Sequence, residues 1–267
     1  MQRFRPYLRL MRKTLYKSIV IMVNKKLNFV LGIGLALAHS SCIVINTSIP
    51  HSDDEVVIEQ TINLSSFDAI DISASEVVFK VGEENKISYT VCEPIAEDVV
   101  IETNNNKLNV GIKGNRGNHI FKCEITSKNH LKDIDASGAC KFIYEGDIAQ
   151  KELDIDISGA TTLIVNGVIN VEELDLDASG ASTISSLNVE CDKLDIDVSG
   201  ASQAELKGKC SNALYDASGA SKISASNMIA QDAVANASGA SNIDMSAIGN
   251  VKKSASGASH ISVKKVE

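Results

Sequence analysis

The most regular feature of the chain is an alternation of apolar and polar residues that returns about every 20 positions. Leu153-Asp-Ile-Asp-Ile is one example. Each such run is followed by Ser-Gly-Ala and then by a second short run of apolar residues. A period of two is typical of a β-strand with one face buried. The pattern therefore predicts an all-β protein with two or three short strands in every repeat.

The tripeptide Ser-Gly-Ala marks the repeat. Successive copies are 21, 21, 20, 19, 20 and 18 residues apart, and they begin at Ser137, Ser158, Ser179, Ser199, Ser218, Ser238 and Ser256. A fixed period of this length is the signature of a solenoid. We therefore expect a right-handed parallel β-helix, or β-solenoid, with coils of ~20 residues.

Alignment of the repeats on this serine predicts the side chains that face inward. They stand one and three residues before the serine and five after it, as Ile157, Ile155 and Leu163 do around Ser158. Lys253 interrupts one of these columns in the last coil, where a cap is expected. Later coils carry Ala where earlier coils carry Ile or Leu, so we expect the later coils to be less stable.

The segment before the regular repeats is also strand-like. Strands are predicted around 77–82, 86–91 and 107–112, separated by Gly- and Asn-rich turns. Residues 67–75 (Phe-Asp-Ala-Ile-Asp-Ile-Ser-Ala-Ser) resemble a degenerate first copy of the repeat. We therefore expect one β-solenoid domain over 56–267, with irregular opening coils at 56–130 and regular Ser-Gly-Ala coils at 131–267.

The N-terminal residues predict export. Lys25 and Lys26 precede an apolar run of 12 residues at 27–38. Such a run is short for a membrane span but usual for a signal peptide. We expect a signal region over 1–41, for which Met22 is the simplest true start.

Cys42 follows two small residues, as a lipidated cysteine does at a bacterial lipoprotein cleavage site. His39 departs from that pattern, because an aliphatic residue usually stands there. We expect Cys42 to carry a lipid that anchors the chain to a membrane, and 42–55 to form a tether. The alternative is ordinary secretion with Cys42 as a chance cysteine.

Composition narrows the class of function. The formal net charge is −8, which argues against a nucleic-acid partner, because nucleic-acid binding needs a basic stripe. No Gly-x-Ser-x-Gly elbow is present, and no His recurs at a fixed repeat position. The sequence therefore predicts neither a catalytic residue nor a cofactor.

Two outward columns of aspartate are the sharpest candidate site. They stand two and four residues before the serine, and neighbouring coils stack Asp154, Asp156, Asp175, Asp177, Asp195 and Asp197. Unit charges ~4.8 Å apart in water repel by about 0.9 kcal/mol, so this face needs relief. Two interpretations are open. A cation, with Ca²⁺ as the natural one, would bridge the carboxylates; alternatively, a solvated acidic face keeps the molecule soluble and blocks edge pairing.

Two further columns are candidates for lesser roles. Ser or Thr recurs three residues after the serine, and would either bond along the stack or present hydroxyls to a glycan. Cys191 and Cys210 both lie eight residues before their serine, so they should be neighbours in adjacent coils. A strand spacing of ~4.8 Å suits a disulfide. Two packed thiols are the other reading.

The opening Phe67-Asp-Ala-Ile-Asp-Ile-Ser and the repeated Asp-Ala-Ser-Gly-Ala-Ser units resemble the putative auto-transporter adhesin, head GIN domain family, a domain of unknown function in Bacteroidetes-type envelope lipoproteins. The resemblance covers about 59–263. It implies a β-helix and a cell-envelope location. We expect an outer-membrane lipoprotein, and whether it is exposed at the cell surface stays open.

Three functions compete. The first is a non-enzymatic binding or adhesion module whose partner is a glycan or a protein surface. The second is a structural envelope spacer. The third, a polysaccharide-processing enzyme, is disfavoured because the acidic residues follow the repeat and Arg116 is the sole arginine after the signal. The sequence does not indicate the ligand, the oligomeric state or the membrane face.

Overall fold

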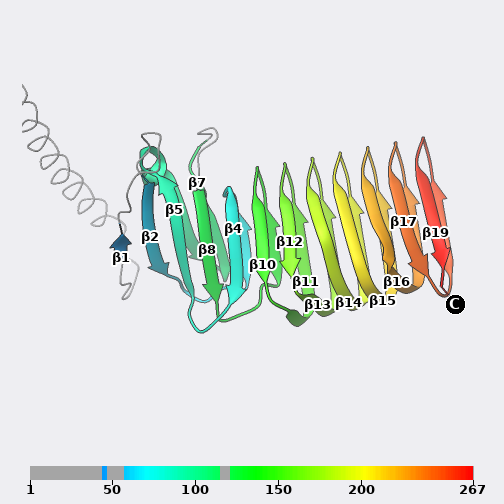
Figure 1. Ribbon diagram of the computed structural model, residues 1–267, viewed down its shortest axis with the longest axis horizontal. Helices are drawn as coiled ribbons and strands as arrows, with labels where there is room; N and C mark the ends of the chain where they lie inside the picture. Colours follow the sequence, from blue (N-terminus) through cyan, green and yellow to red (C-terminus); the bar gives the residue numbers. More distant parts are fainter. Residues whose placement is uncertain (1–43, 47–56, 115–120, 267) are drawn as a thin grey trace, which may run out of the picture. The chain divides into compact units, whose positions relative to one another are not determined.

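The computed structural model describes residues 44–46, 57–114 and 121–266, and nearly all of its ordered elements are β-strands (Figure 1). The predictions for the signal region and for lipidation of Cys42 lie outside these residues. No helix in the described part is both long and apolar enough to cross a membrane.

The strands are β1 (Val44–Asn46), β2 (Val57–Asn63), β3 (Ala69–Ile72), β4 (Glu76–Val81), β5 (Lys86–Cys92), β6 (Val99–Asn104), β7 (Lys107–Ile112), β8 (Phe121–Ser127), β9 (Asp133–Ala136), β10 (Lys141–Glu145), β11 (Ile148–Ile157), β12 (Thr162–Asn166), β13 (Val168–Ala178), β14 (Thr183–Val198), β15 (Gln203–Ala217), β16 (Lys222–Ala237), β17 (Asn242–Ala247), β18 (Val251–Ala255) and β19 (His260–Lys265). One 3₁₀-helix, η1 (Glu93–Asp98), follows β5 and was not predicted.

The regular repeats form a parallel β-solenoid, as predicted. Each strand from β9 onward pairs in parallel with its equivalent one coil away, and the aligned residues are register partners: Ile155 pairs with Ile134 and with Leu176. In Figure 1 the coils from β10 to β19 follow one another along a single axis. The repeat length is therefore the length of one coil.

The opening coils do not follow chain order. β3 lies between β7 and β9, and β4 lies between β8 and β10, with all four pairings parallel. The degenerate repeat is confirmed, because Ile70 pairs with Ile134 and Ile72 with Ala136. The chain thus builds coil β3–β4, leaves it, builds β7–β8 on its outer side, and returns to continue the solenoid on the other.

Antiparallel strands close this end. β5 pairs with β2 and β8, and β6 pairs with β7, all antiparallel. β1, within the segment expected to be a tether, is a three-residue strand antiparallel to β2. Ile95 of η1 is buried in the same core. β5 and β6 therefore pair with the outer coil β7–β8 on the side where no further parallel coil follows.

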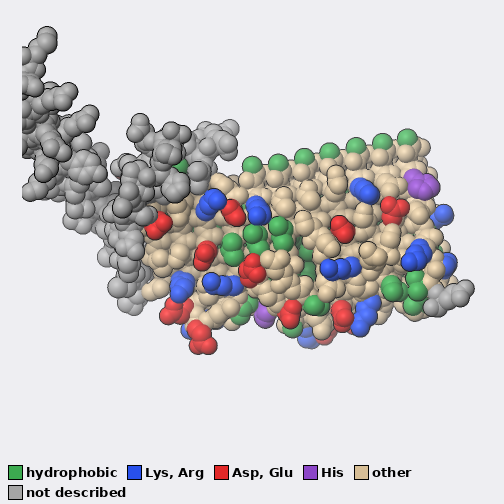
Figure 2. Space-filling model, viewed as in Figure 1, with side chains coloured by type: hydrophobic (Ala, Val, Ile, Leu, Met, Phe, Trp, Pro, Cys, Tyr) green, Lys and Arg blue, Asp and Glu red, His purple; other side chains and the backbone are tan. Residues whose placement is uncertain are grey.

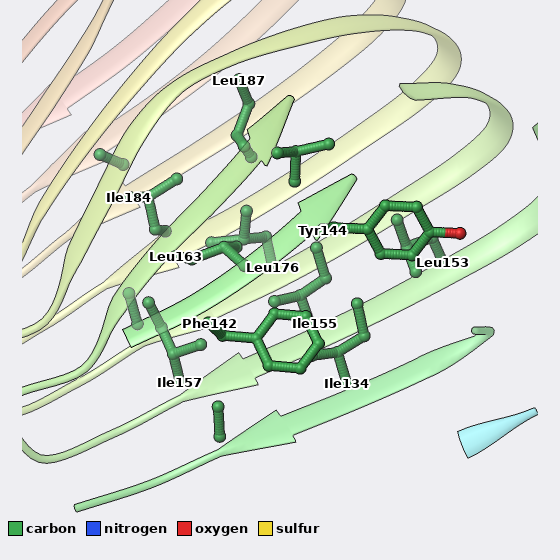
Figure 3. Packing of buried hydrophobic residues seen from close by; sticks show 14 of the residues in the cluster. Ile134, Phe142, Tyr144, Leu153, Ile155, Ile157, Leu163, Leu176, Ile184 and Leu187 are labelled. Carbon is green, nitrogen blue, oxygen red and sulfur yellow. The ribbon is translucent and has the colours of Figure 1, made fainter. Parts of the chain in front are cut away.

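The core runs through the solenoid interior as one cluster of buried side chains. The predicted inward columns are confirmed: Ile155, Ile157 and Leu163 are all fully buried, and they pack with their equivalents from neighbouring coils (Figure 3). Lys253 and Ala255, in the last coil, are exposed. The predicted interruption therefore lies where the described solenoid ends.

Glycine is required at the Ser-Gly-Ala corner for two reasons. Gly180 has φ +76°, a conformation that side-chain-bearing residues rarely adopt. A Cβ added there would also lie 2.6 Å from the carbonyl oxygen of Gly159 in the preceding coil. That same oxygen accepts a 2.7 Å hydrogen bond from the backbone N–H of Ala181. The glycine of the motif therefore allows the backbones of neighbouring corners to pack in direct contact.

Candidate functional site

The aspartate columns lie on one outward face of the solenoid, as predicted, and we call them the aspartate ladder. Asp154 pairs with Asp133 and Asp175, and Asp156 pairs with Asp135 and Asp177. The pairing continues to β14 through Asp195 and Asp197. Identical charges are therefore held one coil apart, at about the 4.8 Å spacing of neighbouring strands.

Lysine relieves one end of the ladder. Lys107 of β7 reaches over Ala69 of β3 and binds both Asp133, at 3.3 Å, and Asp135. At the far end the Asn236 amide donates a 2.7 Å hydrogen bond to Asp216. Nearby, Lys193 pairs with Glu173 rather than with the ladder itself. The carboxylates in the middle of the ladder therefore have fewer cationic or hydrogen-bonding partners than those at its ends.

The middle carboxylates show this in their pKa values. Partial burial, followed by the charges of neighbouring aspartates, raises the pKa of Asp154 and Asp177. The pKa values of Asp156, Asp195 and Asp197 are raised in the same direction, again with burial as the leading cause. Burial favours the neutral acid, and a like charge close by adds to that preference.

Within the described residues, no three His, Cys, Asp or Glu side chains converge as ligands of a metal ion. The ladder is linear, and Ca²⁺ takes six to eight oxygen ligands around one point. Cation bridging of Asp154, Asp156, Asp175, Asp177, Asp195 and Asp197 stays a prediction, beside the solvated-face interpretation.

The hydroxyl column is structural. Thr161, Ser182, Ser202, Ser221 and Ser241 are all buried. Ser241 donates to the carbonyl oxygens of Ser238, at 2.8 Å, and of Ala217 in the preceding coil, at 3.0 Å. Thr161 and Ser182 also donate to carbonyl oxygens at their corners. Because the five side chains are buried, the alternative of a hydroxyl strip offered to a glycan is wrong for these coils.

The two cysteines meet as expected. Cys191 of β14 and Cys210 of β15 are register partners, and both are thiols in this structure. The remaining described thiols, Cys92, Cys123 and Cys140, are buried. Formation of the disulfide stays a prediction.

A pocket that the repeat did not predict lies on another face of the solenoid. Its volume is about 460 Å³, and strands β2, β4, β5 and β8 form it. The lining is mostly polar and consists of Glu59, Gln60, Thr61, Glu76, Val78, Ser88, Tyr89, Thr90, Lys122, Cys123 and Glu124. Most of these residues alternate with core residues along their strands, so they project from the outer side of the sheet.

Paired charges line this pocket, and the buried side chains of Tyr89 and Cys123 lie on the core side of its strands. Glu76 binds Lys122 at 2.8 Å, and this hydrogen bond lowers the pKa of Glu76. Tyr89 donates a 2.7 Å hydrogen bond to the side-chain oxygen of Gln60. Burial raises the pKa of Tyr89 to about 12 and also raises that of the Cys123 thiol. General acid–base catalysts need pKa values near the working pH, and all three shifts lead away from neutrality.

An aliphatic stripe continues from the pocket. Val78, Ile143 and Ile164 are register partners on β4, β10 and β12, and each is partly exposed on the outer side. Figure 2 shows hydrophobic side chains gathered over these three strands. The pocket and the stripe together form one surface, which we call the pocket face.

The pocket face could not be found from the repeat. The residues of its pocket come from 59–61, 76–78, 88–90 and 122–124, and the antiparallel pairing of β5 with β2 and β8 brings them together. The alternation along 86–91 correctly predicts which side chains point outward. It does not predict which strands become neighbours.

Comparison with known proteins identifies relatives of the whole solenoid. The family model described as "Putative auto-transporter adhesin, head GIN domain" matches twice, over residues 66–188 and 154–265. The overlap of the two matches reflects the internal repeat. The search of curated proteins finds no match.

Solved structures show the same fold. A "putative lipid binding protein" from Parabacteroides distasonis is 20% identical, with a TM-score of 0.69 over 78% of this chain and 97% of that one. A "putative adhesin" from Parabacteroides merdae is also 20% identical, with a TM-score of 0.65 over 78% of this chain and 96% of that one. At this identity the likeness establishes the fold.

Proposed function

Because the chain belongs to the putative auto-transporter adhesin, head GIN domain family, we propose that it is a non-enzymatic binding module of the bacterial cell envelope, anchored through lipidated Cys42. The observation that carries the binding role is the pocket face, a 460 Å³ hollow continuous with an aliphatic stripe. Binding sites combine apolar contact with a few placed polar groups, and this surface offers both.

The chemistry of the pocket favours binding over catalysis. Its titratable groups with altered pKa are shifted away from neutrality, whereas Thr61, Ser88 and Thr90 offer hydroxyls on the same surface. The aspartate ladder follows the repeat across several coils and has no single reaction centre. The names of the relatives, adhesin and lipid-binding protein, agree with a binding role.

A glycan array probed with the purified full chain tests the binding role. Thr90 lines the pocket, so Thr90→Trp should fill the hollow and abolish the signal. Thr183→Trp places the same side chain on an exposed position of β14 outside the pocket lining, and it should leave binding unchanged. A chain that binds no array glycan, or a Thr90→Trp variant that binds normally, would favour the structural spacer instead.

The anchor is tested separately. Labelled palmitate should be incorporated into the full chain and not into Cys42→Ala. Surface labelling of intact cells should fall with the same substitution. Unchanged incorporation in Cys42→Ala would contradict lipidation at this residue without bearing on the pocket.

A further inference from the structure

We propose that Cys191 and Cys210 are a disulfide-forming site that links two adjacent coils of the solenoid when the chain meets a thiol–disulfide oxidant. The two residues are direct register partners in the parallel strands β14 and β15. Neighbouring strands lie about 4.8 Å apart, inside the range of Cα separations that a disulfide accepts. The backbone therefore already holds the pair at bonding range.

The two side chains already interact. The interaction with Cys210, together with burial, raises the pKa of Cys191. The corner beside them is also held across the coils, because the Ser211 hydroxyl donates a 3.3 Å hydrogen bond to Asp192. The pairing of β14 with β15 therefore places the two thiols side by side in adjacent coils.

Access distinguishes Cys191 from the other described thiols, its partner Cys210 included. Cys191 is partly exposed, whereas Cys92, Cys123 and Cys140 are buried. Burial shields these thiols from a dissolved oxidant, which must reach a sulfur before it can react with it. An oxidant should therefore reach this pair through Cys191.

The reaction balances with a small disulfide as the oxidant. The Cys191 sulfur attacks one sulfur of the oxidant, which forms a mixed disulfide and releases one thiol. The Cys210 sulfur then attacks Cys191 and releases the second thiol. Two protein S–H bonds and the oxidant's S–S bond are lost, one protein S–S bond forms, and both protons leave on the reduced oxidant.

The position of the link gives it a use. β14 is the last strand in which all three inward positions before the corner hold large side chains, Leu194, Ile196 and Val198. In β15 the first and third of these positions hold Ala213 and Ala217. The link would fasten the weaker coils to the stronger ones. Its use in the cell rests on the proposed envelope location; its formation in the purified chain does not.

Oxidised glutathione is the probe. After treatment of the full chain, alkylation of the remaining thiols and trypsin digestion, mass spectrometry should find the peptide that contains Cys191 joined to the peptide that contains Cys210. The melting temperature should rise by about 6–12 °C, the range expected for closing a short loop in a domain of this size. Cys191→Ser should lose both effects, and Cys123→Ser should keep both relative to its own reduced form.

Three results would overturn the proposal. One is a glutathione adduct on Cys191 that is not resolved by Cys210. The second is full alkylation of both thiols after oxidation. The third is a link that leaves the melting temperature of the chain unchanged. Loss of glycan binding in Thr90→Trp has no bearing on any of these outcomes, so the two proposals fail separately.

Discussion

The earlier and later regular coils share one backbone but bury different side chains. In β11 the three inward positions before the corner are Leu153, Ile155 and Ile157, and in β16 the same positions are Ala233, Ala235 and Ala237. All six are at most 5% exposed. Each replacement of Leu or Ile by Ala removes about 2 kcal/mol of apolar burial. The backbone hydrogen bonds between coils therefore determine the shape of the solenoid, and the buried side chains determine the stability of each coil.

The later coils compensate in part with single large side chains. Tyr215, Met228 and Met245 are fully buried or nearly so. Burial raises the pKa of Tyr215, whose hydroxyl has no hydrogen-bond partner among the described residues. A buried hydroxyl without a partner is itself a cost. We therefore expect the later coils to open first.

The largest expected loss of stability comes from replacing a large inward side chain of an early coil by the alanine found in late coils. Ile155→Ala should lower the free energy of unfolding by about 2–5 kcal/mol, because it leaves a cavity among fully buried neighbours. Ile155→Val should cost only about 0.5–1.5 kcal/mol. Urea titration of the variants measures both. Equal costs for the two would show that the early core is not tightly packed.

The corner should be equally demanding in both halves. Gly180→Ala and Gly239→Ala each combine a φ of +74° to +76° with a Cβ placed 2.6 Å from a glycine carbonyl in the preceding coil. Each should cost more than about 1 kcal/mol. Gly114→Ala has φ +80° but no atom within 4 Å of the added Cβ, so it isolates the backbone strain. Thermal melts measure the three losses of stability. An equal loss in all three variants would contradict a contribution from the clash with the stacked carbonyl.

The aspartate ladder should make the early half sensitive to pH. The pKa values of its middle carboxyls are raised in the folded chain, so the folded state holds these protons more tightly than the unfolded state does. Their stabilising contribution is complete below the unfolded pKa, about 3.9, and it is lost as pH rises through the raised values. Removing one charge at pH 7 should therefore stabilise the chain.

Asp177→Asn tests this sign. At pH 7 it should raise the free energy of unfolding by about 0.2–1 kcal/mol, the size of one like-charge cross-strand contact, and the gain should shrink toward pH 4. Glu205→Gln removes an exposed carboxylate of β15 that stands outside the ladder, and it should show no such trend. Melting temperatures across pH 4–8 compare them. A ladder held by a bound cation would reverse the sign for Asp177→Asn in the presence of that cation.

A difference of similar size should separate two serines of the buried hydroxyl column. Ser241→Ala removes hydrogen bonds to two carbonyl oxygens and should cost about 0.5–1.5 kcal/mol. The Ser221 hydroxyl has no partner among the described residues, so Ser221→Ala should change stability by less than about 0.5 kcal/mol. Matched urea titrations resolve the difference. The reverse order would mean that the corner hydrogen bonds do not hold the coils together.

The sequence predicts the regular coils almost completely, because one local pattern recurs at every step. The inward columns, the ladder and the pairing of Cys191 with Cys210 all follow from counting from the same serine. The opening coils differ, because β3 has no neighbouring repeat in the chain and instead pairs with β7 and β9. The pocket depends on that non-sequential pairing, so alternation within a strand predicts its outward residues but not their meeting.

Hydrogen exchange, measured by mass spectrometry on the reduced chain under native conditions, tests the central comparison most directly. Backbone amides in β16–β18 should exchange faster than amides in β11 and β13, because less apolar area holds the later coils. Oxidation of the Cys191–Cys210 pair should slow exchange most in β15 and β16. Equal protection along the solenoid, or faster exchange in β11 than in β16, would contradict the account.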